Sequence, residues 1–284
     1  MSEAQQPTKS QQTTDSLGEP TQASTPEFRD PVVTQATLSL ISLAKVDLAG
    51  ADLSGANLQG RDLSYSNLAG AKLRETNLHG AKLTGANFHG ADLREAILSE
   101  SFLEQAKLTM ADLRKADLSN AQLESADLSE SILSYAQLNR ANLNQSLLQD
   151  ANLVGASLIE ADLRQAFLRG ANFASSNLTG ADLSHANLIE ANLIDCQLTN
   201  TNLSEANLSG ANLSGANLTG AFLSLADLNT VNLSGAYLNG AQLNQINLQA
   251  ADLSKASLNK ANLSDSNLNR ANLSGADLSD ANLS

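Results

Sequence analysis

The chain has 284 residues and a formal net charge of −13, with no Trp, 3 Tyr, 6 Phe and a single cysteine, Cys196. So few aromatic side chains exclude an ordinary aromatic-rich core, and the negative charge disfavours direct binding to nucleic acid or to an anionic membrane surface. One cysteine excludes an internal disulfide framework. The sequence has no apolar run that resembles a signal peptide or a membrane span, so we expect a cytoplasmic protein without membrane insertion.

The N-terminal segment differs in composition from the rest of the chain. Residues 1–29 are rich in Gln, Thr, Ser and Pro and poor in apolar side chains, so they cannot offset the entropy of ordering. We predict a disordered tail. Residues 30–45 begin with Asp30 and Pro31, which suit the N-cap and first turn of a helix. Two interpretations stay open for this segment: a short capping helix, or an irregular first coil of the following domain.

From residue 46 to residue 284 the chain runs in units of five residues without an insertion. The central residue is Leu in 46 of 48 units and Phe in the other two, Phe88 and Phe173. Ala stands two positions earlier in 35 units, Asp or Asn stands one position earlier in 32, and 16 of the 17 glycines lie two positions later. A frame that persists this long indicates a structural repeat.

A period of five fits neither a regular helix nor a flat strand. On an α-helix a step of five residues turns the side chain by roughly 140°, which scatters the leucines around the cylinder. On a flat strand successive leucines would point to opposite faces. All leucines share one interior only if the backbone turns a corner in each unit, which gives a square coil of four units and 20 residues. In such a coil Ala points inward, Gly allows the corner conformation, and Asp or Asn can bond nearby backbone groups.

The A(D/N)LxG units of residues 46–284 resemble those of the pentapeptide repeat family. This resemblance implies an all-β fold, a right-handed quadrilateral β-helix, with about twelve coils of 20 residues. The family includes DNA-mimicking modulators of topoisomerases and regulatory partners in filamentous cyanobacteria. The resemblance therefore implies a bacterial protein and leaves more than one function open.

Residues that carry catalytic or metal chemistry are few and scattered. His79 and His89 are ten residues apart, which places them on opposite walls, and His185 lies about five coils away. Cys196 takes an inward Ala position, where we expect a buried structural thiol. The serines lack a histidine with an orienting acid that would activate them. We therefore predict a non-enzyme with no catalytic residue, no cofactor and no metal site.

Outward-facing residues are more informative, because residues 20 apart are stacked on one wall. Leu147 and Phe167 occupy the outward Asp/Asn position of one wall, with Ile189 on the next coil. We predict a candidate protein-docking patch there, and the alternative is local packing against neighbouring coils. A candidate contact at the end of the rod is Leu283, which we expect to be covered by a second copy, in end-to-end self-association, or by another protein.

Three arginines, Arg74, Arg94 and Arg114, are spaced by 20 and form a candidate basic ladder. Acidic residues alternate with them along the chain, namely Glu75, Asp92, Glu95 and Asp112. One interpretation is a surface ion network that neutralises itself, and the other is a site for an anion or an acidic partner.

These patterns predict a non-catalytic rod that acts as a scaffold or regulatory partner for other proteins. The alternative is a DNA mimic that binds a topoisomerase or another DNA-binding protein. It is motivated by residues 120–250, where 11 acidic and 3 basic side chains give a net charge of −8.

Overall fold

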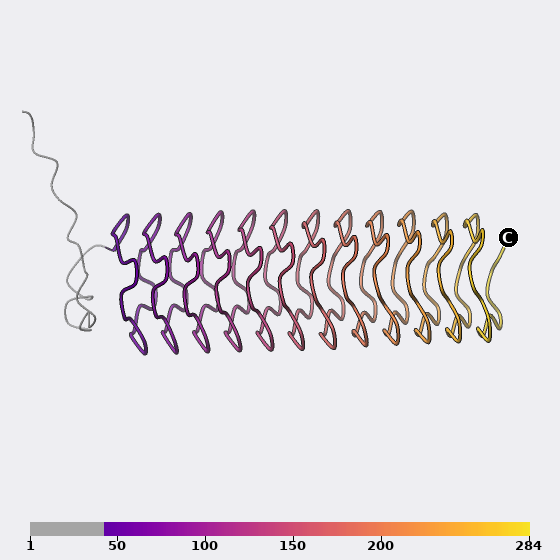
Figure 1. Cartoon of the computed structure of the whole chain (residues 1–284), viewed down its shortest axis with the longest axis horizontal. Coiled ribbons are helices and arrows are strands. Elements are labelled where there is room, and N and C mark those ends of the chain that lie inside the picture. The colour runs from indigo at the N-terminus through magenta and orange to yellow at the C-terminus, as the bar shows by residue number, and fades with distance from the viewer. Residues whose placement is uncertain (1–42) are drawn as a thin grey trace, which may run out of the picture.

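The computed structural model describes residues 43–284, which form one continuous rod of stacked coils (Figure 1). The coils follow one another in chain order from the indigo end to the yellow C-terminal end. Within these residues there is neither a helix nor an extended strand; 44 single-residue parallel bridges each join a residue to the one 20 positions later, from Asp47–Asn67 to Asn262–Asn282. The predicted right-handed quadrilateral β-helix of 20-residue coils is confirmed.

The predicted tail, residues 1–29, lies outside the described residues. The segment 30–45 also lies outside them, except for its last three residues. Those three already follow the repeat: Leu43 is buried, and the backbone N–H of Lys45 donates to the Ser64 carbonyl at 2.9 Å. The repeat conformation is therefore present from Leu43, three residues before the predicted start of the β-helix.

The interior of the rod is a column of central Leu or Phe side chains with the Ala side chains beside them. Phe88 and Phe173 are fully buried, like the leucines that surround them. At four of the six positions where Ser replaces Ala, the hydroxyl donates to the backbone carbonyl three residues earlier, at 2.6–2.7 Å: Ser66, Ser101, Ser131 and Ser146. These inward hydroxyls have their hydrogen-bond partner inside the rod, as buried polar groups require.

A five-residue unit with an outward Asn can find an acceptor for all five of its backbone N–H groups. In the unit 66–70, two N–H groups donate to the following coil: Leu68 to the Asn87 carbonyl at 2.7 Å and Gly70 to the His89 carbonyl at 2.8 Å. Ser66 and Asn67 donate to carbonyls of earlier residues, at 3.1 and 2.9 Å. The remaining N–H, that of Ala69, donates to the Asn67 side-chain Oδ1 at 3.3 Å. The outward Asp or Asn side chain thus completes the hydrogen bonding of its own unit.

Every corner has the same left-handed backbone conformation. The residue two positions after the central one has positive φ in all 48 corners from Lys45 to Asp280, and 32 of these residues are not glycine. The N–H of the next residue then donates to the central carbonyl, as Ala51 does to Leu48 at 3.0 Å, which closes a β-turn. No corner from Glu95 to Asp150 is a glycine, although an L-residue with positive φ costs about 1 kcal/mol or more.

Two corner glycines separate the backbone cost of a side chain from its steric cost. Gly70 and Gly85 have φ of +63° and +64°, but an added Cβ has open space at Gly70 and would lie 2.6 Å from the Tyr65 ring at Gly85. We expect Gly70→Ala to lower the free energy of unfolding by about 1 kcal/mol. Gly85→Ala should cost more and also displace Tyr65. Chemical denaturation with Tyr fluorescence measures both effects, and equal losses with an unchanged Tyr65 environment would contradict this account.

Candidate functional site

The structure brings Leu147 and Phe167 together on one wall of the rod. The two residues form a parallel bridge, and the Phe167 N–H donates to the Ser146 carbonyl at 2.9 Å. Phe167 is 45% exposed and Leu147 is half-buried. Phe167 bridges Asn187 on the next coil, and half-buried Ile189 lies two residues beyond Asn187. We call Leu147, Phe167 and Ile189 the docking patch.

The docking patch interrupts the hydrogen bonding of the repeat. On the next coil of this wall, the N–H of Ile189 donates to the Asn187 side chain at 3.2 Å. Leu147 and Phe167 stand one position before the central residue, where the repeat most often has Asp or Asn; we call this the Asx position. Their side chains have no acceptor for the N–H groups of Gln149 and Arg169. A net hydrogen bond contributes about 0.5–1.5 kcal/mol, so the two apolar residues forgo stabilisation that Asn would supply.

The pair is also unusual among the outward apolar residues. Five further Asx positions hold an exposed apolar side chain: Ile97, Phe102, Ile132, Phe222 and Tyr237. In the part of the chain that the structure describes, each of these five bridges polar residues, and Leu147–Phe167 is the one bridge with two apolar members. Leu147 and Phe167 thus form a contiguous apolar area among polar bridge residues of the same wall.

Acidic side chains border one edge of the docking patch. Glu130, Asp150 and Glu190 occupy the corner that follows this wall, on coils 20 or 40 residues apart. Arg169 lies between them and pairs with Glu190, with Nη2 and Nε at 3.1 and 3.3 Å from the same carboxylate oxygen. A hollow of about 350 Å³ opens here, lined by Gln149, Asp150, Arg169, Gly170 and Glu190. Sequence reasoning missed this acidic corner, although the 20-residue spacing of Glu130 and Asp150 could have indicated it.

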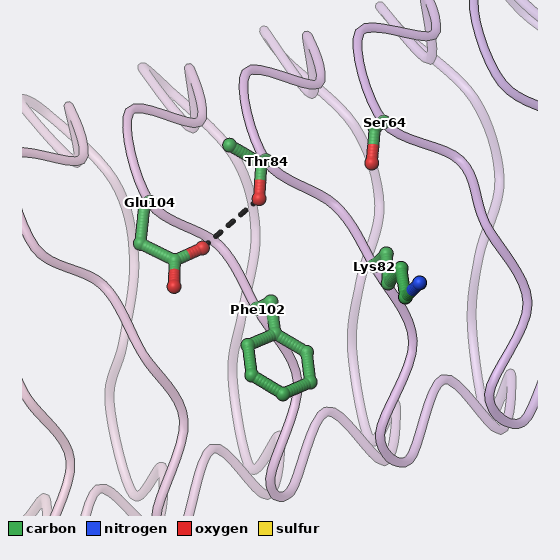
Figure 2. A pocket seen from close by; sticks show the side chains of 5 residues that line it. All are labelled: Ser64, Lys82, Thr84, Phe102 and Glu104. Carbon is green, nitrogen blue, oxygen red and sulfur yellow. Dashed lines mark hydrogen bonds between the residues drawn. The ribbon is translucent and has the colours of Figure 1, made fainter.

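A second hollow, which the sequence did not predict, lies on the preceding wall nearer the N-terminal end (Figure 2). It has a volume of about 450 Å³ and is lined by Ser64, Lys82, Thr84, Phe102 and Glu104. The Thr84 hydroxyl donates to Glu104 Oε2 at 3.0 Å, which ties two successive coils together beside the Phe102 ring. Lys82 and Glu104 give this hollow charges of both signs.

The arginines of the basic ladder each face carboxylates. Arg74 lies 3.3 Å from Glu75 and 3.5 Å from Glu95, while Arg94 and Arg114 form bidentate pairs with the aspartate two residues before them. The hydrogen bond from Arg94 lowers the pKa of Asp92 below 3.8. This geometry favours the ion network over a site for an anion or an acidic partner.

Cys196, His89 and His185 each contact a neighbouring group of the rod. Burial raises the pKa of Cys196 to about 11, and its thiol donates to the Phe173 carbonyl at 2.8 Å. Residues 43–284 contain no group of three or more His, Cys, Asp or Glu side chains arranged to hold a metal ion. His185 instead lies 3.3 Å from Glu205, and His89 contacts Thr109 at 2.7 Å.

The last described coil is less buried than those before it. Leu283 is 55% exposed, and Leu268, Leu273 and Leu278 are only partly buried. The apolar surface expected at Leu283 is therefore present, while the end-to-end contact itself stays a prediction. Among residues 43–284 we found no helix of sufficient length and hydropathy to cross a membrane.

Comparison with known proteins gives a family match along most of the chain. The family model described as pentapeptide repeats matches in eight copies, at residues 28–60, 62–99, 97–134, 136–174, 167–205, 176–215, 206–245 and 246–284. None of the curated proteins matches the chain.

Three solved structures illustrate the similarity. HetL is a pentapeptide repeat protein involved in heterocyst differentiation regulation, from the cyanobacterium Nostoc sp. strain PCC 7120. It is 31% identical over 82% of this chain and 89% of its own, with a TM-score of 0.34. Rfr23, from the cyanobacterium Cyanothece 51142, is 31% identical over 40% of this chain and 64% of its own, with a TM-score of 0.30. QnrB1, a plasmid-mediated fluoroquinolone resistance protein, is 20% identical over 77% of this chain and 89% of its own, with a TM-score of 0.35.

The ion network should make stability depend on pH. Because the pKa of Asp92 is lowered in the folded chain, its contribution is present above about pH 4 and is lost as pH falls through the lowered value. We expect the melting temperature of Arg94→Gln to fall less between pH 5 and pH 2 than that of the unmodified chain. Arg140→Gln is the control, because its pair with Glu160 is largely exposed and solvent-screened. Parallel pH profiles for all three chains would contradict the prediction.

The docking patch should be dispensable for folding. Phe167→Asn loses part of a half-buried ring but restores the side-chain acceptor for the Arg169 N–H, so we expect a change of no more than about 1 kcal/mol in the free energy of unfolding. Phe173→Ala, inside the column, should cost about 3–5 kcal/mol. Urea denaturation compares the two variants. A loss above about 2 kcal/mol for Phe167→Asn would mean that Phe167 serves packing.

Proposed function

The chain belongs to the pentapeptide repeat family, and on this basis we propose that it is a non-catalytic rod that binds a protein partner through the docking patch. The observation that carries the proposal is the bridged pair Leu147–Phe167, an apolar area at a position where the repeat most often has Asp or Asn. Protein-binding surfaces are enriched in large apolar and aromatic anchors, of which Phe167 is an example.

A stiff rod suits such a role because its binding residues are held at fixed spacing. Leu147 and Phe167 sit in backbone that is hydrogen-bonded to both neighbouring coils, as in the bond from Leu148 N–H to the Phe167 carbonyl at 2.8 Å. The rod therefore loses little conformational entropy when a partner contacts these residues, which favours affinity. We place this role in the cytoplasm, where a single reduced cysteine is the ordinary condition.

The alternative, a DNA mimic, receives weaker support from the arrangement of the acids. A mimic needs carboxylates in register along the rod, at a density comparable with that of duplex phosphates. In the acidic zone 120–250 the three arginines each pair with a carboxylate: Arg140 with Glu160, Arg164 with Asp162, and Arg169 with Glu190. The acids left over are spread over several walls, which favours an apolar contact as the main source of affinity.

Site-specific photocrosslinking tests the proposal in the native host. The full chain carries p-benzoylphenylalanine in place of Phe167, and the matched control carries it in place of Phe222. Phe222 has the same position in its unit and nearly the same exposure, 48% against 45%, but lies on another wall. We expect a discrete protein adduct from position 167 and none of that mass from position 222.

Mass spectrometry of the adduct identifies the crosslinked protein. The same adduct should become several-fold weaker when Leu147→Asp accompanies the probe, because a charge beside the anchor opposes its desolvation. No adduct at position 167, or identical adducts at both positions, would reject the docking patch as the binding surface.

A further inference from the structure

We propose that the docking patch recognises a basic amphipathic segment, in which apolar side chains contact Leu147 and Phe167 while a Lys or Arg on one side enters the acidic hollow at Asp150. This inference deepens the proposed function and rests on it. The patch has the two components that such a segment requires, an apolar surface and an acidic rim along one edge.

The charge of the rim has a definite sign. Glu130, Asp150 and Glu190 against Arg169 give three negative charges and one positive, a net of −2. The Arg169 guanidinium is already engaged by Glu190 at 3.1 Å. Among the described residues, Glu130 and Asp150 have no ion-pair partner. Two carboxylates beside the apolar surface are therefore available to a cation of the partner.

Gly170 makes room for the Asp150 carboxylate, which borders the polar hollow. The corner row continues from Asp150 to Gly170 to Glu190, and a Cβ added at Gly170 would meet the Asp150 Oδ1 atom. The Asp150 carboxylate therefore lies over Gly170, and both residues line the polar hollow of about 350 Å³ together with Glu190. A guanidinium or ammonium group in the hollow would lie beside the Asp150 carboxylate, which can accept a charge-assisted hydrogen bond from it.

The opposite edge of the patch has no comparable charge. It is formed by the corner residues Gln145 and Gln165, whose side-chain amides are hydrogen-bonded to each other at 2.9 Å. His185 follows on the next coil and faces Glu205 at 3.3 Å. The partner's basic residues should therefore lie on one side of its apolar stripe only.

The coil spacing suits a helical partner. Stacked coils are about 4.8 Å apart, close to the roughly 5.4 Å pitch of an α-helix, so apolar residues three or four apart can contact successive coils. The hollow at Phe102 lacks the same selectivity, because it holds both Lys82 and Glu104 and has a lone aromatic residue. Charge sign and anchor pairing together distinguish the docking patch from that hollow.

Two synthetic helical peptides test the inference on the full chain. Each has about 18 residues, enough for five turns, with leucines three or four apart; one carries lysines along a single edge and the other carries glutamates there. Fluorescence anisotropy at low salt should show binding of the lysine peptide at least about tenfold tighter than that of the glutamate peptide. The preference should shrink as ionic strength rises from about 50 to about 500 mM.

Variants locate the interaction on the rod. Asp150→Asn should weaken the binding of the lysine peptide by about threefold to tenfold. Asp195→Asn should not, although Asp195 has a nearly identical backbone φ and likewise lies against a glycine 20 residues later, Gly215. Phe167→Asn should abolish binding, whereas Phe222→Asn should leave it intact. Melting temperatures well above the assay temperature for all four variants exclude unfolding as the cause.

Each other outcome counts against the inference. Failure of the lysine peptide to bind, equal affinity of both peptides, or equal effects of Asp150→Asn and Asp195→Asn would overturn it. The Phe167 crosslink is independent of the peptides. If the crosslink forms while the peptides show no charge preference, the docking function stands and the basic partner is wrong. If the crosslink also fails, both proposals fall.

Discussion

The left-handed corner at every fifth residue is the constraint on which the rest of this structure depends. It turns the chain so that each central Leu points to the same axis, where an extended chain would send successive units to opposite faces. Glycine preference alone does not produce the corner, because 32 of the 48 corners are occupied by other residues. Glu100 illustrates the point: its φ is +58°, and its N–H donates to the Ser119 carbonyl at 2.9 Å. The hydrogen bonds between coils therefore hold conformations that single residues would not choose.

This economy confines function to a small part of each unit. The central residue and the Ala are consumed by the column, and the corner residue must tolerate positive φ. Even the outward Asp or Asn has a structural task, because its side chain accepts the N–H that no backbone carbonyl reaches. Leu147 and Phe167 give up that bond and expose apolar surface as well, a local loss without a visible structural gain. Departures of this kind from the rules of a fold are typical of binding sites.

Much of the fold followed from the sequence, because a five-residue period admits one geometry and every residue then has a known wall. The same arithmetic placed Leu147 over Phe167 and Arg94 over Arg114. It did not indicate where outward side chains leave hollows. Thr84 and Glu104 form their hydrogen bond, and Asp150 lies against Gly170, because of side-chain directions that the repeat leaves free. The sequence also left open whether the arginine ladder was self-neutralised, since that depends on rotamers which bring Arg94 onto Asp92.

The direction in which corner side chains lean determines part of the surface of the rod, beyond what the five-residue unit determines. Several of them lie against a glycine in the next coil: Tyr65 at Gly85, Tyr135 at Gly155, Asp150 at Gly170, Asp195 at Gly215 and Asn200 at Gly220. A glycine therefore serves its own corner and also receives the side chain 20 residues earlier. Where that side chain is a tyrosine, its ring covers the space beside the glycine. Where it is an aspartate, a carboxylate borders the same space. The five-residue unit thus determines the fold of the rod, while pairs of residues 20 apart, on successive coils, determine which chemical groups its corners expose.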